Sequence, residues 1–223
     1  MEDVFKSSKS ENRGLQLLNN NMTHILSLGI STGGIAELKM ARKCPNAKII
    51  ATTIDKKGLE FSRNILATYP ESKSIETRLE DVSKPMPYDD NMFDYVYARL
   101  VLHYLTKQQL QSTLKEIYRI LKPGGIFFVV VRNNNEWELS KPEFVISYDE
   151  YTNMTTYYEQ WKYDRIHTRQ FLSEQQLETL LHEHSFNIDS IESYREYLYT
   201  DYERTEKNKS SKPNYITEVV ASK

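Results

Sequence analysis

The chain has 223 residues, of which 39% are hydrophobic and 27% charged, and its formal net charge is −2. This length accommodates one α/β domain with a full core. The near-neutral charge argues against nucleic acid as a partner, and the lack of a long apolar stretch argues against the membrane. A single cysteine, Cys44, excludes an internal disulfide framework. We therefore expect a cytoplasmic protein in which Cys44 is a small apolar residue at a helix end.

The first part of the chain alternates apolar runs with helical patterns. Residues 1–22 predict a lead-in segment, frayed over 1–13 and helical over 14–21. The sequence then predicts buried strands at 24–30, 48–55, 74–81, 92–99 and 126–132. It predicts amphipathic helices at 33–44, 57–69 and 106–121, the last of which ends at a Pro-Gly-Gly turn. Such alternation is typical of a parallel sheet with helices on both faces.

The pattern changes after residue 132. Residues 133–167 are polar and aromatic without a strong period, which predicts an insert. A helix capped by Ser173 is predicted at 173–184, followed by two late strands at 186–199 and 215–223. We predict a Rossmann-like, doubly wound α/β domain over residues 23–223. Its sheet is mostly parallel and seven-stranded, with an antiparallel C-terminal edge strand.

Sheets of this kind bind ligands at the carboxyl ends of their strands, so the turn after the first strand is informative. The segment LSLGISTGG has Gly29 at the strand end, Ser31 in the turn and Gly33 at the start of the helix. Small residues let a ligand approach the backbone, and the start of a helix offers free N–H groups to an anion. Glycines also occur at strand ends for steric reasons, so this turn needs support from other positions.

Two acidic residues follow the next two predicted strands. Asp55, 26 residues after Gly29, is placed to accept hydrogen bonds from both hydroxyls of a ribose. Asp81 is placed to accept a hydrogen bond from the amine of an adenine. The alternative for each is structural: Asp55 could cap the following helix, and Asp81 could stabilise a turn.

In residues 23–132 the sequence resembles the class I S-adenosylmethionine-dependent methyltransferases. The resemblance depends on the order of its parts: the glycine-bearing turn, Asp55, the pair Asp81-Val82, FDYVYARLVLHYL at 93–105 and LKPGG at 121–125. It implies S-adenosylmethionine as the cofactor. The residues implied to contact this cofactor are Ser27, Gly29, Ile30, Ser31, Gly33, Asp55, Lys56, Asp81, Val82 and Arg99.

Two positions depart from the family pattern. Ser27 replaces an acid that in this family helps to hold the cationic amino end of the cofactor. Ser31 replaces a glycine that often needs a positive φ, which costs a non-glycine residue about 1 kcal/mol. Both departures favour a rival hypothesis, a non-catalytic methyltransferase-like binding or assembly subunit. A nicotinamide enzyme fits less well, because Gly29, Ser31 and Gly34 match its Gly-x-Gly-x-x-Gly pattern imperfectly.

The resemblance implies methyl transfer to oxygen or nitrogen of a small-molecule acceptor. A sulfonium methyl is already electrophilic, so the protein has to align the acceptor and exclude water. A general base helps with a hydroxyl or amine acceptor, and His103 is the predicted catalytic residue, with a packing role as the alternative. His167 and Arg132 are weaker candidates, and His182 and His184 are expected at the surface. No Cys/His cluster has metal-ligand spacing, so no metal is predicted.

The 133–167 insert lies where this family often builds a substrate cover. Its aromatic residues could wall an acceptor pocket or hold a cationic amine by cation–π contact. Alternatively, they pack the insert onto the domain or onto a second copy of the chain in a homodimer. These residues are Trp137, Tyr148, Tyr151, Tyr157, Tyr158, Trp161 and Tyr163.

Overall fold

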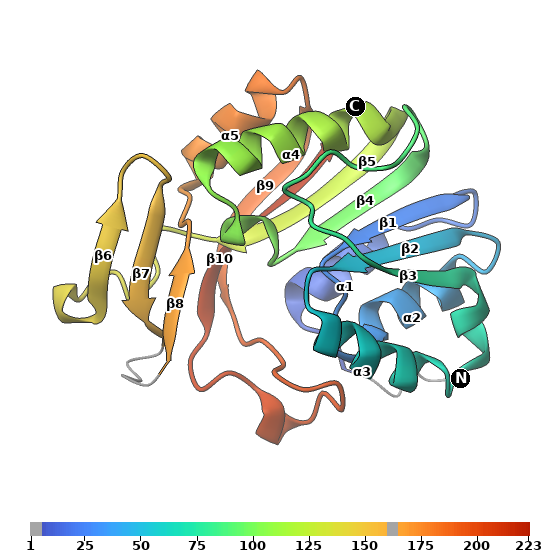
Figure 1. Cartoon of the computed structure of the whole chain (residues 1–223), viewed down its shortest axis with the longest axis horizontal. Coiled ribbons are helices and arrows are strands. Elements are labelled where there is room, and N and C mark those ends of the chain that lie inside the picture. Colours follow the sequence, from blue (N-terminus) through green and yellow to red (C-terminus); the bar gives the residue numbers. More distant parts are fainter. Residues whose placement is uncertain (1–5, 160–164) are drawn as a thin grey trace.

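The protein was analysed as a computed structural model, which describes residues 6–159 and 165–223. Figure 1 shows a central sheet with helices on both faces and a smaller sheet beside one end. The central sheet has seven strands in the order β3-β2-β1-β4-β5-β10-β9. Their bounds are β1 His24–Leu28, β2 Lys48–Thr53, β3 Ile75–Leu79, β4 Phe93–Arg99, β5 Leu121–Arg132, β9 Asn187–Glu196 and β10 Asn214–Ser222.

The directions of the strands confirm the predicted fold class. Strands β1 to β5 pair in parallel, and their order reverses between β1 and β4. Strand β10 runs antiparallel to both of its neighbours, β5 and β9. The antiparallel strand is therefore the last strand of the chain, but it lies one position inside the edge formed by β9.

Helices cover both faces of this sheet. They are α1 Lys9–Gln16, α2 Ile35–Lys43, α3 Lys56–Leu66, α4 Lys107–Ile120 and α5 Glu174–Glu183, with 3-10 turns at Thr32–Gly34, Pro70–Ser74, Leu102–Tyr104, Pro142–Phe144 and Glu206–Asn208. Helix α5 begins with the predicted Ser173 cap, which accepts the Gln176 N–H. Within the described ranges no helix combines the length and the apolar character that a membrane crossing requires.

Strand β5 shows why its sequence is a continuous apolar run. Successive side chains of a strand point to opposite faces of the sheet. Phe127 and Val129 pack with α4 and α5, whereas Phe128 and Val130 pack on the opposite face with α2. All four are fully buried, as expected for a strand covered on both faces.

The insert contains a second sheet that the sequence pattern did not predict. Strands β6 Val145–Asp149, β7 Met154–Tyr158 and β8 Ile166–Arg169 form a three-stranded antiparallel sheet in this order. In β7 the buried positions are Thr155 and Tyr157, and they alternate with more exposed neighbours. Because the two inward-facing side chains carry hydroxyl groups, the sequence of β7 does not show the alternation of apolar and polar residues that indicates a half-buried strand.

The lead-in helix also differs from its prediction. Helix α1 begins at Lys9 instead of residue 14, and two of its polar side chains, Ser10 and Glu11, are fully buried. Residues 9–13, expected to fray, are therefore helical. The structure satisfies these polar groups with partners from distant segments, which a local pattern does not reveal.

Candidate functional site

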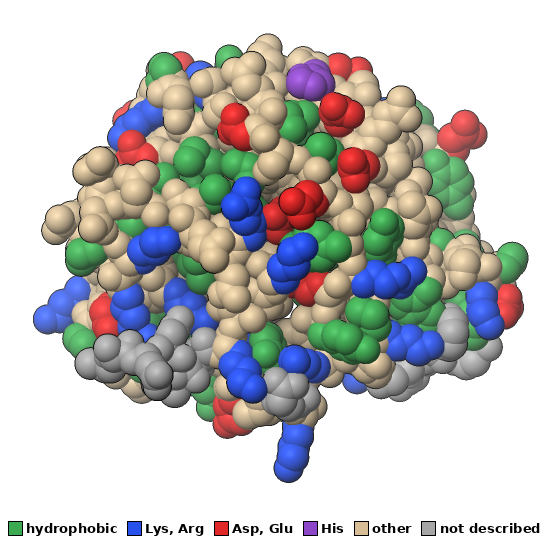
Figure 2. All heavy atoms as spheres, turned by 180° about the vertical axis from the view of Figure 1, so that it is seen from behind, with side chains coloured by type: hydrophobic (Ala, Val, Ile, Leu, Met, Phe, Trp, Pro, Cys, Tyr) green, Lys and Arg blue, Asp and Glu red, His purple; other side chains and the backbone are tan. Residues whose placement is uncertain are grey.

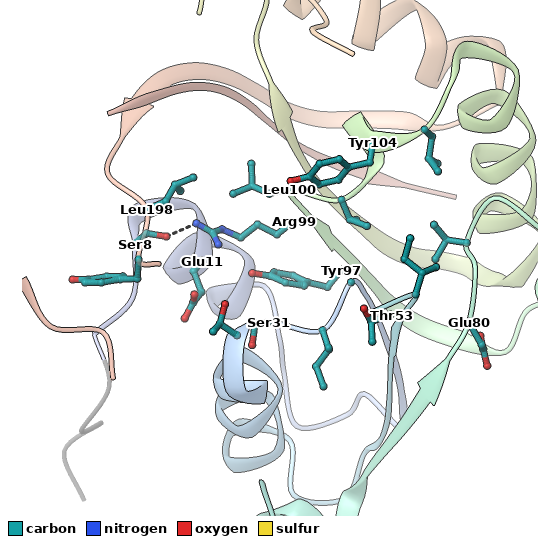
Figure 3. A pocket seen from close by; sticks show the side chains of 18 of the residues that line it. Ser8, Glu11, Ser31, Thr53, Glu80, Tyr97, Arg99, Leu100, Tyr104 and Leu198 are labelled. Atoms are coloured by element: carbon teal, nitrogen blue, oxygen red, sulfur yellow. Dashed lines mark hydrogen bonds between the residues drawn. The ribbon is translucent and has the colours of Figure 1, made fainter. Parts of the chain in front are cut away.

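A cavity of about 490 Å³ lies at the carboxyl ends of β1 to β4, where the strand order reverses. We call it the first cavity. Its lining comes from the tips of these strands, from α1 and from the connection between β9 and β10, residues 197–213 (Figure 3). The lining residues are Ser8, Glu11, Gly29, Ile30, Ser31, Thr32, Thr53, Ile54, Glu80, Asp81, Val82, Tyr97, Arg99, Leu100, Val101, Tyr104, Leu105, Leu198, Tyr199 and Arg204.

Among the predicted cofactor residues, some line this cavity and others do not. Gly29, Ile30, Ser31, Asp81, Val82 and Arg99 line it, whereas Ser27, Gly33, Asp55 and Lys56 are not part of its lining. The turn after β1 and the tip of β3 therefore meet at one site, as the sequence predicted. The local structure around the turn after β1 and the start of α3 explains why the other four residues lie outside the lining.

The turn after β1 takes its left-handed residues at glycines. Gly29 has φ 76°, and a Cβ atom there would lie 3.0 Å from Val101. Gly33 has φ 71°, and a Cβ atom there would lie only 2.6 Å from the Cβ atom of Tyr202. Ser31, in contrast, has φ −64° and ψ 156°, an extended conformation open to any residue. The backbone strain expected at Ser31 is therefore absent, and that expectation was wrong.

A carboxylate from α2 lies beneath this turn. Glu37 is fully buried, and its Oε1 atom accepts hydrogen bonds from the Ser27 hydroxyl at 2.6 Å and the Ser31 N–H at 3.2 Å. Its Oε2 atom accepts the Ser31 hydroxyl at 2.6 Å. No lysine, arginine or histidine of the described ranges pairs with it. The two serines that replace family residues thus share one carboxylate, which restores a negative charge beside the turn.

At the end of β2, the residue that lines the cavity, Thr53, and the residue that caps α3, Asp55, are two positions apart. The Asp55 carboxylate accepts the Lys57 N–H at 3.0 Å through Oδ1 and caps α3, which is one of the two roles left open by the sequence. Lys56 is exposed in the first turn of this helix. Thr53 and Ile54, which the sequence analysis did not select, line the cavity instead.

The tips of β2 and β3 give the cavity a polar edge and an apolar wall. Asp81 accepts the Ser83 N–H at 3.0 Å, and hydrogen bonds from Ser83 hold the pKa of the Asp81 carboxyl below its ordinary value. Nearby Ile54 is 73% exposed although it is apolar, and Val82 contributes a second apolar side chain. Carboxylates beside exposed apolar groups suit a flat ring that carries hydrogen-bond donors.

Helix α1 and the β9–β10 connection close the opposite end of the first cavity. Arg99, at the end of β4, donates to the Ser8 hydroxyl at 2.6 Å, as drawn in Figure 3, and to the Ser10 hydroxyl at 2.7 Å. Glu11 pairs with Arg204 from the connection. Burial favours the neutral form of Glu11, but Arg204 and Arg99 outweigh it and hold its pKa below the ordinary value. This end therefore carries fixed charges of both signs.

His103, the predicted catalytic residue, lines a second cavity of about 570 Å³. This second cavity adjoins the first, because Leu100, Tyr104, Leu198 and Tyr199 line both. The His103 side chain is 2% exposed. Burial, and then the charges of Arg169 and Arg132, lower the pKa of its imidazole far below the ordinary value, so it is neutral near pH 7.

The side chains of the other three histidines named in the sequence analysis, His167, His182 and His184, do not line either cavity. His167 lies 2.9 Å from Glu159 and lines neither cavity, whereas Arg132 lines the second. His182 is exposed, and His184 is half-buried and contacts the Leu180 carbonyl. In the part of the chain that the structure describes, no group of three His, Cys, Asp or Glu side chains is arranged to hold a metal.

The described aromatic residues of the insert do not line either cavity. Tyr157 is fully buried and accepts a hydrogen bond from Arg169, whereas Tyr148 and Tyr151 are 57% and 72% exposed. Trp161 and Tyr163 lie outside the described residues. The aromatic residues that border both cavities are Tyr104, which follows β4, and Tyr199 of the β9–β10 connection; neither was selected as a site residue from the sequence.

The chain is similar in sequence to known methyltransferases over the segment that contains β1 to β4, whose tips line the first cavity. The family model for the methyltransferase domain matches residues 26–129, from β1 into β5. A 119-residue match is 34% identical to demethylmenaquinone methyltransferase of Symbiobacterium thermophilum and covers 53% of this chain and 43% of that protein. A 104-residue match is 35% identical to a ubiquinone/menaquinone biosynthesis C-methyltransferase of Desulfotalea psychrophila and covers 45% and 38%. The chain thus spans less than half the length of these relatives.

Solved structures extend the likeness to the whole fold. An S-adenosylmethionine-dependent methyltransferase of Methanosarcina mazei superposes with a TM-score of 0.70 at 18% identity, over 93% of this chain and 95% of that one. A second, from Listeria monocytogenes, has a TM-score of 0.68 at 16% identity, over 96% and 98%. Residues 26–129 thus match the methyltransferase-domain family, and the whole chain has the fold of these solved methyltransferase structures.

Proposed function

We propose that this chain binds S-adenosylmethionine in the first cavity and transfers its methyl group to oxygen or nitrogen of a small-molecule acceptor in the second. The observation that carries the proposal is the juxtaposition of the two cavities at the switch point of the sheet, with four residues common to both walls. Named relatives include C-methyltransferases, so the atom methylated is part of what has to be tested.

The residues of the first cavity suit each part of the cofactor. Asp81 offers a carboxylate to the adenine amine, and Ile54 and Val82 offer apolar contacts to its ring. The Thr53 hydroxyl, at the tip of β2, is suited to the ribose. The Arg99 guanidinium suits the carboxylate of the methionine part.

The cationic end of the cofactor would lie near the turn after β1. The negative charge of Glu37 lies directly beneath Ser31 and forms no ion pair within the described ranges. A positive group above this turn would offset that charge. Glu37 thus takes over the electrostatic role that an acid at position 27 has in the family, which answers the main argument for a non-catalytic rival.

The bound cofactor supplies an electrophilic methyl group, which the lone pair of the acceptor takes while the electrons of the carbon–sulfur bond remain on sulfur. The chain's own residues then have two tasks. The walls formed by Leu100 and Tyr104 exclude water and hold the acceptor in line. His103, which lines the second cavity, is the proposed acceptor of the proton that the substrate loses. Its lowered pKa means that it holds this proton only weakly and passes it on to solvent.

Calorimetric titration with S-adenosylmethionine and with its demethylated product tests this assignment. We expect both to bind the wild-type protein. Asp81→Ala should weaken binding about tenfold or more, because it removes a hydrogen bond to a charged group. The matched control is Asp55→Ala, which should leave the affinity within about twofold but lower the free energy of unfolding by about 1 kcal/mol, through loss of the α3 cap.

Two outcomes would overturn parts of the proposal. If neither compound produced heat with the wild-type protein, the non-catalytic rival would be favoured. If Asp55→Ala weakened binding as much as Asp81→Ala, the ribose would lie at Asp55 and not at Thr53.

A further inference from the structure

The second cavity has a positively charged lining. Arg132, Arg165, Arg169 and Lys209 line it, and Glu159 is the acid among the described lining residues. The basic residues come from three separate parts of the chain: the end of β5, strand β8 with the residue before it, and the β9–β10 connection. Figure 2 shows lysine and arginine side chains gathered along the lower part of the molecule, where this connection lies.

Two of these arginines are buried and held in place. Arg132 and Arg169 are 3% and 6% exposed. Arg169 donates to the Tyr157 hydroxyl at 2.7 Å and to Glu159 at 3.3 Å, and its guanidinium lies 5.1 Å from the centre of the Tyr104 ring. Arg132 donates to Glu136 at 3.0 Å. Their positions are thus fixed before any ligand arrives, which reduces the entropy cost of binding.

Two buried nitrogens at this cavity have no hydrogen-bond partner in the described structure, Nε of Arg169 and Nδ1 of His103. Nη2 of Arg132 instead lies 3.5 Å from Oε1 of the buried Glu138, with which it forms an ion pair. A buried polar group without a partner costs about 1–3 kcal/mol, so such groups are rare unless a ligand or water satisfies them. Two of them on residues that line one cavity indicate a missing polar partner at that wall.

The charge of the lining decides which partner fits. A cationic amine would be repelled by the arginines, and an apolar ring would leave the buried N–H donors unsatisfied. A carboxylate or phosphate group offers two or more acceptor oxygens that match the fork of an arginine. The anion would lie beside Arg169, whose guanidinium is next to Tyr104 on the wall common to both cavities.

We propose that the methyl acceptor is a small organic anion, anchored in the second cavity by its carboxylate or phosphate group through Arg169 and Arg132. This inference rests on the proposed function, since it names the substrate class of the same site. The anchor places the rest of the acceptor past Tyr104, toward the first cavity. The insert therefore contributes to the site through Glu159 and Arg165, and none of its described aromatic residues lines either cavity.

Ligand-observed NMR with matched fragments tests the proposal. The probes are small aromatic and aliphatic carboxylates, their neutral primary amides and phosphate monoesters of similar size, each added to protein saturated with the demethylated cofactor. We expect the carboxylates or the phosphates to bind at least tenfold more tightly than the amides. The group that binds identifies the anion, and amides that bind equally well would overturn the proposal.

Variants assign the binding to this cavity. Arg169→Gln should weaken anion binding at least tenfold, whereas Arg195→Gln, an exposed arginine on β9 that lines neither cavity, should leave it unchanged. Arg165→Gln replaces an exposed residue and should weaken binding two- to fivefold even if Arg169→Gln fails to fold. Anion binding that none of the cavity variants reduces would contradict the proposal.

The same samples separate this inference from the proposed function. The affinity for the demethylated cofactor is measured in parallel by calorimetry. Cofactor binding without any anion binding at 10 mM, roughly the weakest affinity a fragment shows in a true site, would refute the anionic acceptor and leave the cofactor site intact. Absence of cofactor binding would refute the proposed function, while the anion titration still reports on the second cavity.

Discussion

The Glu37 carboxylate lies within hydrogen-bonding distance of two serine hydroxyls and one N–H group at the turn after β1. The electrostatic effect of a charge on a ligand depends on its distance from the ligand and not on which helix or strand supplies it. Here a helix residue provides the charge, and serine at positions 27 and 31 provides the hydroxyl groups that hold it. The three side chains therefore form one unit.

Substitutions in this unit should be strongly non-additive. Ser27→Asp places a second carboxylate against Glu37 and should lower the free energy of unfolding by about 3 kcal/mol or more. Glu37→Gln alone should cost about 1.5–3 kcal/mol through lost charged hydrogen bonds. Urea denaturation of the double variant should show a loss at least 1 kcal/mol smaller than the sum of the two, about the coupling expected for contacting residues. Additive losses would show that the carboxylates do not meet.

The sequence made Ser27 and Ser31 visible as departures, but it did not reveal their partner. Glu37 lies ten residues after Ser27 and resembles any acid of an amphipathic helix. Its burial depends on how α2 lies across β1. A residue whose role comes from tertiary packing leaves no local signal.

At the scale of elements, Asp94 connects three strands at the amino end of the sheet. This residue of β4 accepts hydrogen bonds from the Thr23 N–H at 2.8 Å, the His24 N–H at 2.9 Å and the Lys122 Nζ at 2.5 Å. Burial favours the neutral acid, but these bonds outweigh it and hold the pKa of Asp94 at about 2. The carboxylate thus stabilises the register of β1, β4 and β5 opposite the cavities.

This pKa predicts a pH dependence of stability. The ordinary pKa of the group is 3.8, so its contribution is present above about pH 5 and is lost as the pH falls toward 2. The contribution should be about 2 kcal/mol. Asp94→Asn should therefore lower the free energy of unfolding at pH 6 and differ little from wild type at pH 2, by urea denaturation.

An exposed acid provides the control. Asp189→Asn, on β9, should leave the stability unchanged at both pH values, because its side chain is exposed and forms no hydrogen bond with a described residue. A constant difference between the wild type and Asp94→Asn across this range would contradict the assigned pKa.

Long apolar strands and well-capped helices could be predicted from the sequence because local pattern and tertiary role agree in them. The three-stranded sheet of the insert could not, because its buried residues include Thr155 and the charged Arg169. At the tip of β2 the acid caps α3 while Thr53, two residues earlier, lines the cavity, so the ribose contact predicted for Asp55 stays a prediction. Strand β2 ends at Thr53 and α3 is capped at Asp55, so the distance in sequence from Gly29 could not distinguish a cavity-lining residue from a helix cap.

At the scale of the whole molecule, the first helix of the chain meets the end of β9 and the β9–β10 connection over the first cavity. The Ser10 N–H of α1 donates to Glu196 at the end of β9 at 3.0 Å, and Glu196 lies 3.5 Å from Arg99. Glu11 pairs with Arg204 and lies 3.6 Å from Lys39. Two of these contacts, Ser10 with Glu196 and Glu11 with Arg204, link residues almost 200 positions apart, so no local pattern could predict them. They make α1 and the β9–β10 connection part of the site.

The two cavities lie side by side and have four lining residues in common. The first meets the tips of β1 to β4, the second meets the arginines of β5 and β8, and Leu100, Tyr104, Leu198 and Tyr199 separate them. For the proposed methyl transfer, the nucleophilic atom of the acceptor must contact the sulfonium methyl in line at this common boundary. Every residue role assigned above depends on the cofactor lying on one side of it.

A crystal structure with the demethylated cofactor bound tests this claim most directly. We predict that the adenine will lie beside Asp81 and Ile54, and that the sulfur atom will face the wall at Leu100 and Tyr104. Density for the cofactor in the second cavity, or a first cavity that stays filled by side chains at saturating cofactor, would contradict the account.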